Sequence, residues 1–111
     1  MTRTYKVSVT AGAKGDLRSL HRNILRRRSR AEADALLDDL LDRAESLRTF
    51  PERGSVPPEL EEVGLSGYRQ IRFGRIRLVY LVRGDAVFIL LVADVRRDLQ
   101  SLLRDRLLRS G

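Results

Sequence analysis

The chain has 111 residues, of which 42% are hydrophobic and 33% charged, and its formal net charge is +7. These values predict a single folded domain over residues 1–111 and exclude a disordered chain. The sequence has no cysteine and one histidine, His21, so disulfides, thiolate catalysis and cysteine-ligated metals are excluded. No apolar run approaches the roughly 20 residues that span a bilayer. We expect a cytoplasmic protein with no metal and no cofactor.

Positive charge is unevenly distributed along the chain. Residues 1–62 hold 12 basic and 11 acidic side chains, whereas residues 63–111 hold 10 and 4, and 20 of the 22 basic residues are arginines. Arginine binds phosphate through a planar, bidentate fork, which lysine cannot offer. The C-terminal half is therefore predicted to meet an anionic partner such as RNA, DNA or an acidic protein. Codon usage in a GC-rich genome would give the same arginine bias without a function.

The first half of the chain predicts a strand followed by two helices. Polar and apolar residues alternate from Tyr5 to Val9, which indicates a half-buried strand. An apolar stripe at helical spacing then runs from Leu17 to Leu25, and His21 lies on it, where packing is favoured over catalysis. The spacing of Ser29 and Glu32 is that of a capping box, which predicts the start of a second helix. Because almost nothing separates the helices, we expect an antiparallel hairpin.

The second half predicts three strands and a terminal helix. All three prolines fall within 49–67, which indicates a loop, and its acids Glu59, Glu61 and Glu62 are expected to be solvated. Strands over 68–73, 75–83 and 86–93 follow, with turns at Gly74 and Gly84. The last strand is apolar at every position, so it belongs inside a covered sheet. A final helix begins near Asp94 or Asp98.

The predicted order is β-α-α-β-β-β-α, which is an α+β fold. We expect a mostly antiparallel, twisted sheet packed against the helical hairpin and the C-terminal helix, with the helices gathered on one face. If Leu78 and Tyr80 face the helices, alternation places the strand arginines on the opposite face. That face is predicted to carry a basic cluster around Tyr68 and Gln70, and the alternative is a solvated face without function. The cluster consists of Arg72, Arg75, Arg77 and Arg96.

Three short stretches resemble one known protein family. They are 49–54 (TFPERG), 68–71 (YRQI) through 77–80 (RLVY), and 94–98 (DVRRD). Together with the element order, they resemble the RelE/ParE superfamily of toxins from type II toxin–antitoxin systems. The resemblance implies a neutralising antitoxin encoded beside the toxin. It also implies one of two activities, because members are either ribosome-dependent mRNA endonucleases or inhibitors of DNA gyrase that cleave nothing.

The resemblance to the endonuclease branch implies roles for individual residues. Arg77 falls on a strand arginine that contacts the scissile phosphate, and Arg96 falls on a second arginine near the end of the last strand. Their cationic donors would stabilise the charge that the phosphate gains. The resemblance is poor for the groups that transfer protons. On the first strand of the hairpin, where ribonuclease members carry lysines or a glutamate, this chain has Tyr68 and Gln70, or Arg69 and Ile71 if the register slips by one. An arginine keeps its proton at neutral pH and is a poor general base. Contacts with neighbouring nucleic acid are expected from Tyr68, Arg69, Gln70, Arg72, Arg75 and Arg97.

Two functions from different classes remain open, and the first is favoured narrowly. The first is a metal-independent, ribosome-dependent mRNA endonuclease, with the ribosome and mRNA as partners. The second is a binding protein directed at DNA gyrase, which needs no proton-transfer residues. A toxin-like fold kept only for binding is a third possibility. Tyr80 is expected in the core, with its hydroxyl bonded locally.

Overall fold

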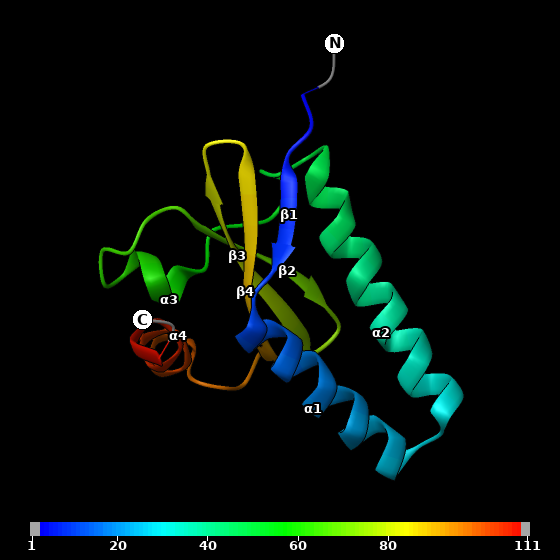
Figure 1. Ribbon diagram of the computed structural model, residues 1–111. Helices are drawn as coiled ribbons and strands as arrows, with labels where there is room; N and C mark the ends of the chain where they lie inside the picture. The colour runs from blue at the N-terminus through cyan, green and yellow to red at the C-terminus, as the bar shows by residue number, and fades with distance from the viewer. Residues whose placement is uncertain (1–2, 110–111) are drawn as a thin grey trace.

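The computed structural model describes residues 3–109, which form a four-stranded sheet with helices on both faces (Figure 1). The element order agrees with the predicted β-α-α-β-β-β-α, and the predicted α+β fold is confirmed. Two short helical turns, η1 and α3, are additional. The elements are β1 (Lys6–Val9), α1 (Ala11–Arg27), α2 (Arg30–Glu45), η1 (Ser46–Arg48), α3 (Pro58–Glu61), β2 (Tyr68–Phe73), β3 (Ile76–Arg83), β4 (Ala86–Asp94) and α4 (Leu99–Arg109).

The sheet has the strand order β1-β4-β3-β2. β2, β3 and β4 are consecutive antiparallel strands, and β1 pairs with β4 in parallel, so the sheet is mixed. Gly74 and Gly84 adopt positive φ values of 59° and 57° in the two hairpin turns, a conformation that glycine adopts without steric cost. β4 lies between β1 and β3, and its buried residues contribute to the apolar clusters on both faces, whereas Phe88 is exposed.

The helical hairpin forms where the sequence places its caps. Thr10 caps α1 by accepting a hydrogen bond from the Ala13 N–H at 3.2 Å, and Ser29 caps α2 by accepting one from the Glu32 N–H at 3.1 Å. Each cap satisfies an N–H that has no partner within its helix. The predicted start of the second helix at Ser29 is therefore confirmed.

The two faces of the sheet carry two separate apolar clusters. α1 and α2 cover one face, and α3 and α4 cover the other (Figure 1). The prediction that all helices gather on one face is therefore wrong. Its physical reason is β4, because a strand apolar on both sides needs cover on both sides. The hairpin-side cluster includes Leu17, Leu40, Leu47, Tyr80 and Ile89, and the other consists of Leu60, Val79, Leu91, Leu99 and Leu103.

An ion pair ties the end of α4 to the start of α1. Arg106 donates two hydrogen bonds to the Asp16 carboxylate, each 2.8 Å long, and a third to the Leu90 carbonyl. Asp16 also accepts from the Val92 N–H. β1 pairs only as far as Ile89, so these side chains bond backbone groups of β4 that β1 is too short to reach.

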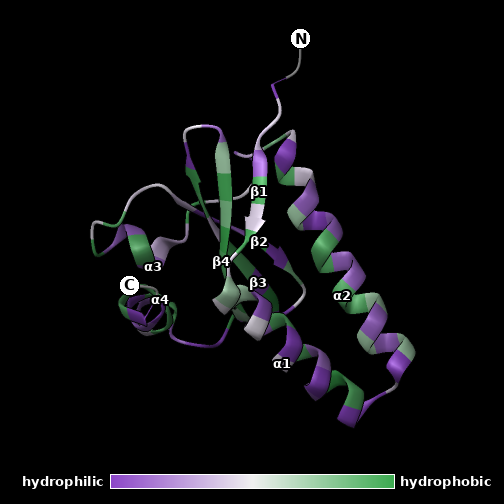
Figure 2. Cartoon of the chain, in the orientation of Figure 1, coloured by the Kyte–Doolittle hydropathy of each residue, from purple (hydrophilic) through white to green (hydrophobic). Residues whose placement is uncertain are grey.

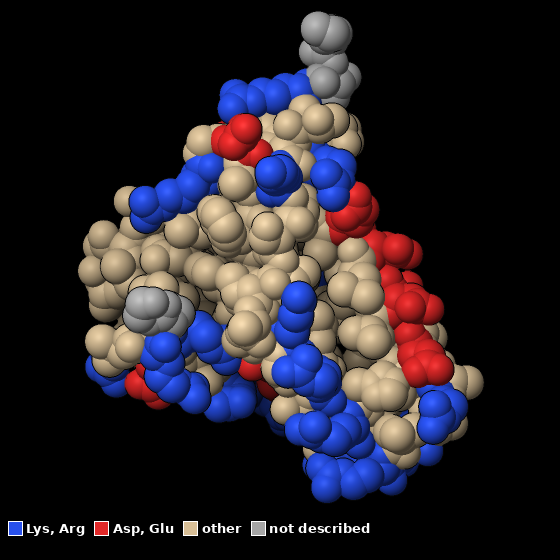
Figure 3. Space-filling model, viewed as in Figure 1, with Lys and Arg blue, Asp and Glu red and all other residues tan. Residues whose placement is uncertain are grey.

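Charge and hydropathy are distributed differently on the two helices of the hairpin. Figure 2 shows apolar residues concentrated on β3 and β4 and alternating with polar ones along α2. Acidic side chains form a ridge on α2, and basic ones gather on α1 (Figure 3). The net charge of residues 1–62 is close to zero because it combines two surfaces of opposite sign.

None of the helices within residues 3–109 is long and apolar enough to cross a membrane.

Candidate functional site

Arg77, which the sequence places at the centre of the basic cluster, is almost fully buried. Arg77 is 4% exposed and lies beneath α3 and the connection from β4 to α4. One terminal nitrogen, Nη1, donates to the Glu59 carboxylate at 2.6 Å and to the Gln70 side-chain oxygen at 3.2 Å. The other, Nη2, donates to the carbonyls of Arg97 at 3.2 Å and Val95 at 3.4 Å. The guanidinium therefore connects β3 to three other segments, which are α3, β2 and the connection from β4 to α4.

Alternation assigned Arg77 to the correct face of the sheet, but this face is not open. Gln70 is buried beside Arg77, and Tyr68 is half-buried against the apolar cluster of α3 and α4. Arg72, directly opposite Arg77 on β2, remains exposed. The predicted open cluster around Tyr68 and Gln70 is therefore wrong as a description of the surface, because α4 and α3 cover the centre of this face.

Glu59 is the functional candidate that sequence reasoning missed. The interpretation of this residue as part of a solvated loop is wrong, whereas Glu61 and Glu62 are exposed as expected. Pro58 is the first residue of α3. This position suits proline because an N–H there would have no partner within the helix. Leu60 is fully buried and anchors this single turn, so the carboxylate of Glu59 is directed at Arg77. The sequence Pro-Pro-Glu-Leu could have predicted this helical turn, because proline favours the first position of a helix.

The pKa of Glu59 reports its environment. Partial burial alone would raise the pKa of this carboxyl, but hydrogen bonds from its own backbone N–H and from Arg77 lower it by more. The net pKa is lowered from 4.5, and the positive charge of Arg72 contributes to the same direction. The Glu59 carboxylate is therefore ionised at neutral pH and neutralises Arg77.

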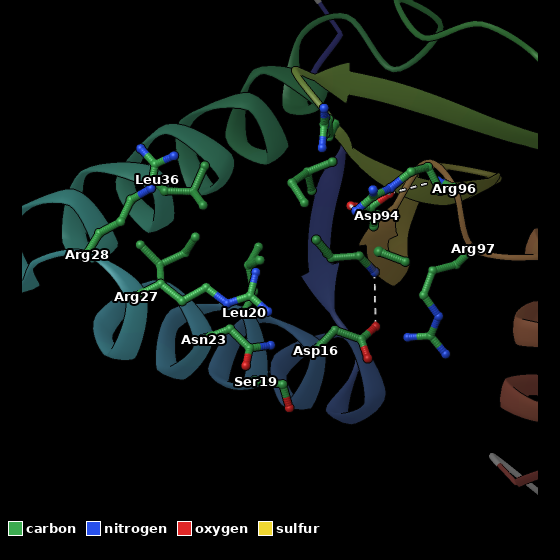
Figure 4. A pocket seen from close by; sticks show the side chains of 15 residues that line it. Asp16, Ser19, Leu20, Asn23, Arg27, Arg28, Leu36, Asp94, Arg96 and Arg97 are labelled. Atoms are coloured by element: carbon green, nitrogen blue, oxygen red, sulfur yellow. Dashed lines mark hydrogen bonds and ion pairs between the residues drawn. The ribbon is translucent and has the colours of Figure 1, made fainter.

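The remaining arginines of the predicted cluster lie elsewhere, in a cleft of about 600 Å³ between the hairpin and the end of the sheet. Arg75, Arg96 and Arg97 are among the residues that line it, and Figure 4 shows Arg96 and Arg97 on the side of the sheet. Arg27 and Arg28 reach it from the end of α1, and apolar side chains such as Leu20 and Leu36 lie between. The predicted single cluster is thus divided between two sites.

Arg96 is not a free cation, because Asp94 pairs with it. Two hydrogen bonds of 3.0 Å join the Arg96 guanidinium to the Asp94 carboxylate, and the Arg96 N–H adds a third. These hydrogen bonds hold the pKa of Asp94 at about 2. The pair is exposed on its arginine side, so water screens its charge.

Arg69 and Tyr80 fix the loop that precedes β2. Arg69 donates to the carbonyls of Gly54 at 2.8 Å and Glu52 at 3.3 Å, so its guanidinium is engaged within the fold. The fully buried Tyr80 hydroxyl donates to the Pro51 carbonyl at 2.7 Å and accepts from the Gly54 N–H at 3.0 Å. Burial raises the pKa of this hydroxyl. The predicted core position of Tyr80, with local bonding of its hydroxyl, is confirmed.

No metal site is evident in the part of the chain that the structure describes. Residues 3–109 contain no group of three histidine, aspartate or glutamate side chains arranged to hold a metal. His21 lies on the hairpin and bonds to Asp34 of α2 at 2.8 Å. This contact joins α1 to α2, and a packing role for His21 stays a prediction.

A comparison with models of known protein families identifies the family of this chain. Residues 7–99 match the model of the ParE toxin of the type II toxin–antitoxin system parDE. The chain belongs to the ParE toxin family. The RelE/ParE resemblance of the sequence is therefore confirmed, and this protein is a type II toxin of that superfamily.

Solved structures of toxins share its fold. A chromosomal ParDE system from P. aeruginosa superposes with a TM-score of 0.69 at 16% identity, covering 83% of this chain and 97% of that one. The RelBE2 toxin–antitoxin complex from Mycobacterium tuberculosis gives 0.56 at 26% identity, covering 82% and 98%. A free mutant of the E. coli toxin RelE gives 0.62 at 16% identity, covering 96% and 97%. The comparison with curated protein sequences found no match.

Proposed function

We propose that this ParE-family toxin acts by binding DNA gyrase and does not cleave mRNA. The observation that supports the proposal is the state of Arg77, which is buried and neutralised by Glu59. An RNA-cleaving site needs a positive charge that is available to the reacting phosphate. A guanidinium already bonded to a carboxylate, an amide oxygen and two carbonyls offers little to an incoming substrate.

Apart from Glu59, the groups around Arg77 also lack the means to transfer protons, and the Glu59 carboxylate, whose pKa is lowered, is a weak base already bonded to Arg77. Cleavage requires a base for the RNA 2′-hydroxyl and an acid for the leaving oxygen. Gln70 does not titrate, and its side-chain oxygen is bonded to Arg77. Tyr68 packs among apolar residues. A toxin that works through contact with a protein target needs none of these steps, and the family match to ParE points in the same direction.

Ribosome-dependent mRNA cleavage remains the second candidate. The fold likeness to RelE spans nearly the whole chain, and the cleft between the hairpin and the sheet presents Arg75 and Arg97 on its wall. In this alternative, Arg77 and Arg96 bind the reacting phosphate while Arg72 and Arg75 hold neighbouring ones. That arrangement requires Glu59 to leave Arg77 and Asp94 to leave Arg96 before RNA binds.

We also propose a cognate antitoxin as the partner that neutralises this toxin. Related structures are described as a ParDE system and as a toxin–antitoxin complex. The arginines of the cleft favour an acidic segment, and its apolar floor favours an amphipathic one. Co-expression with the product of a neighbouring reading frame should give a complex in which Arg27, Arg75 and Arg97 lose solvent exposure. If those arginines stay fully exposed in the complex, this assignment of the cleft is wrong.

Induced expression separates the two target hypotheses. Cells are labelled in pulses with methionine and thymidine while DNA breaks are followed after induction. Gyrase inhibition predicts DNA breaks and filamentation first, with methionine incorporation continuing. Immediate loss of methionine incorporation, with cuts inside translated messages, would overturn the gyrase proposal. The matched variant is Arg96→Ala, which should abolish cleavage by the nuclease and leave gyrase inhibition in place.

A further inference from the structure

The helical hairpin presents opposite charges side by side on one exposed face. Basic side chains line α1 and acidic side chains line α2, with uncharged side chains between them (Figure 3). We propose that this face is the contact surface for a second copy of this chain, in which α1 of each copy lies over α2 of the other. The proposal depends neither on the toxin's target nor on the cleft assigned to the antitoxin.

The charges on each helix are spaced so that they share one side. Exposed cations recur every four residues on α1, and exposed acids recur every four residues on α2. The basic row consists of Lys14, Arg18 and Arg22, and the acidic row consists of Asp34, Asp38 and Asp42. Like charges at this spacing repel each other along a helix, so each row is destabilising unless opposite charges meet it.

Within the chain the two rows scarcely meet. His21 bonds to Asp34 at 2.8 Å and so joins the two helices at one point. In the part of the chain that the structure describes, no ion pair engages Lys14, Arg18, Asp38 or Asp42. These exposed charges of opposite sign therefore lie on adjacent helices without neutralising each other, and they are available to a second molecule.

A mostly apolar groove lies between the two rows. Its volume is about 270 Å³, and Leu17 and Leu37 are among the residues that line it. Leu41 lies one turn beyond Leu37 on the same side of α2 and is 41% exposed. The cleft assigned to the antitoxin is a separate one, lined by Leu20 and Leu36. A second copy on the groove therefore leaves that cleft open.

Symmetry determines which arrangement of two copies the charges allow. A two-fold axis along the groove places the basic row of each copy on the acidic row of the other, whereas an axis across the groove would bring like charges together. Arg18 and Leu37 line the same groove, so the first axis brings Arg18 of one copy level with Asp38 of the other. Lys14 and Asp42 meet one turn further along, because α1 and α2 are antiparallel. Each contact occurs twice in such a dimer.

The expected dimer is weak and sensitive to salt. Each copy has a formal net charge of +7, which opposes association. At about 0.1 M salt this repulsion is screened beyond about 10 Å, whereas the facing rows lie closer together than that. α1 has 17 residues and is about 25 Å long, so the face is small for a stable interface. Exposed ion pairs also contribute little individually, so several must act together.

Sedimentation velocity of the purified full-length toxin measures this association. At about 0.1 M salt we expect a monomer–dimer equilibrium, and at about 1 M salt, where the screening length is about 3 Å, association should weaken at least about tenfold. The double variant Asp38→Lys with Asp42→Lys has two basic rows, and Lys14→Glu with Arg18→Glu has two acidic rows. Each variant alone should associate at least about tenfold more weakly than the wild type, because like charges face each other.

Mixing the two variants is the decisive step. In an equal mixture each basic row meets an acidic one, so a heterodimer should form with about the affinity of the wild type. The matched controls change the net charge by the same amounts outside the hairpin and should associate as the wild type does. They are Glu61→Lys with Glu62→Lys, and Arg83→Glu with Arg104→Glu, all at exposed positions. Thermal unfolding verifies that every variant is folded.

Three results would overturn the proposal. The first is a wild type that stays monomeric at about 0.1 M salt, where the rows are least screened from each other. The second is a control pair that loses association as the hairpin variants do, and the third is a mixture that fails to form the heterodimer. If the wild type is monomeric and Asp38→Lys with Asp42→Lys abolishes gyrase inhibition or antitoxin binding, the face serves that partner instead. Gyrase inhibition by the wild type is measured separately, so its absence leaves the dimer result standing.

Discussion

The two faces of the sheet are built on different principles. On the hairpin face, α1 and α2 bury aliphatic and aromatic side chains that the sequence marks by simple periodicity. On the face covered by α3 and α4, a smaller apolar cluster surrounds a buried cation and its ionic partner. The first face supplies most of the apolar burial. The second contains the ion pair of Arg77 and Glu59, and an ion pair of this kind constrains the geometry without being a strong source of stability.

The largest effect is expected on the hairpin face. Leu40→Ala removes a side chain that is 2% exposed in the core, and we expect a loss of about 3 kcal/mol in the free energy of unfolding. Leu41→Ala, one residue along the same helix and 41% exposed, should cost less than about 1 kcal/mol. Urea denaturation of both variants checks the comparison. Equal losses would mean that α2 does not pack as described.

On the opposite face, Arg77→Met should cost somewhat less. It breaks the contact with Glu59, but that carboxylate is partly exposed and can be rehydrated, so we expect about 2 kcal/mol. Arg83→Met, at the exposed end of the same strand, is the matched control and should be near neutral. A stability equal to the wild type in Arg77→Met would show that the network does not hold α3 to the sheet.

Tyr80→Phe tests the junction between the hairpin face and the loop before β2. The change removes the hydroxyl and leaves the Gly54 N–H and the Pro51 carbonyl without their partner, at a cost of about 1–2 kcal/mol. The hydroxyl of Tyr68 makes no hydrogen bond within residues 3–109, so Tyr68→Phe should change stability much less. Calorimetry of the two variants measures the difference, and similar melting of both would contradict the bonding described.

The smallest effect concerns pH. The pKa of Glu59 is lowered in the folded state, so its stabilising contribution is complete above the unfolded value of 4.5 and is lost as pH falls through the folded pKa. The stability difference between wild type and Glu59→Gln should therefore be constant near neutral pH and shrink below about pH 4.5. Denaturant unfolding at several pH values measures it. A difference that grows on acidification has the wrong sign for this ion pair.

The sequence predicts the elements and the orientation of most side chains because local rules govern them. Strand alternation correctly separates Arg77 from Leu78, and the cap at Ser29 starts α2. The cover on the second face was also encoded, in the apolar positions of β4 that point away from the hairpin. A general packing rule that places helices on one face of a sheet does not take account of this pattern.

The site was less predictable because its contacts join distant segments. Glu59 and Arg77 are separated by 18 residues, and no local pattern indicates that a one-turn helix will bring them together. The same limit applies to Asp16 and Arg106, which meet across the edge of β4. The net charge of residues 1–62 also does not indicate the charge of the surface, because it combines the basic α1 with the acidic α2. The roles of individual arginines in binding a target remain predictions.

Purified components test directly whether this toxin inhibits DNA gyrase or cleaves mRNA. The toxin, released from its antitoxin, is added in parallel to a DNA gyrase supercoiling reaction and to ribosomes translating a defined mRNA. Action on gyrase predicts that supercoiling is inhibited in proportion to toxin while the mRNA stays intact. Cleavage of the ribosome-bound mRNA, with supercoiling unaffected, would contradict it and would mean that Glu59 leaves Arg77 when the toxin acts.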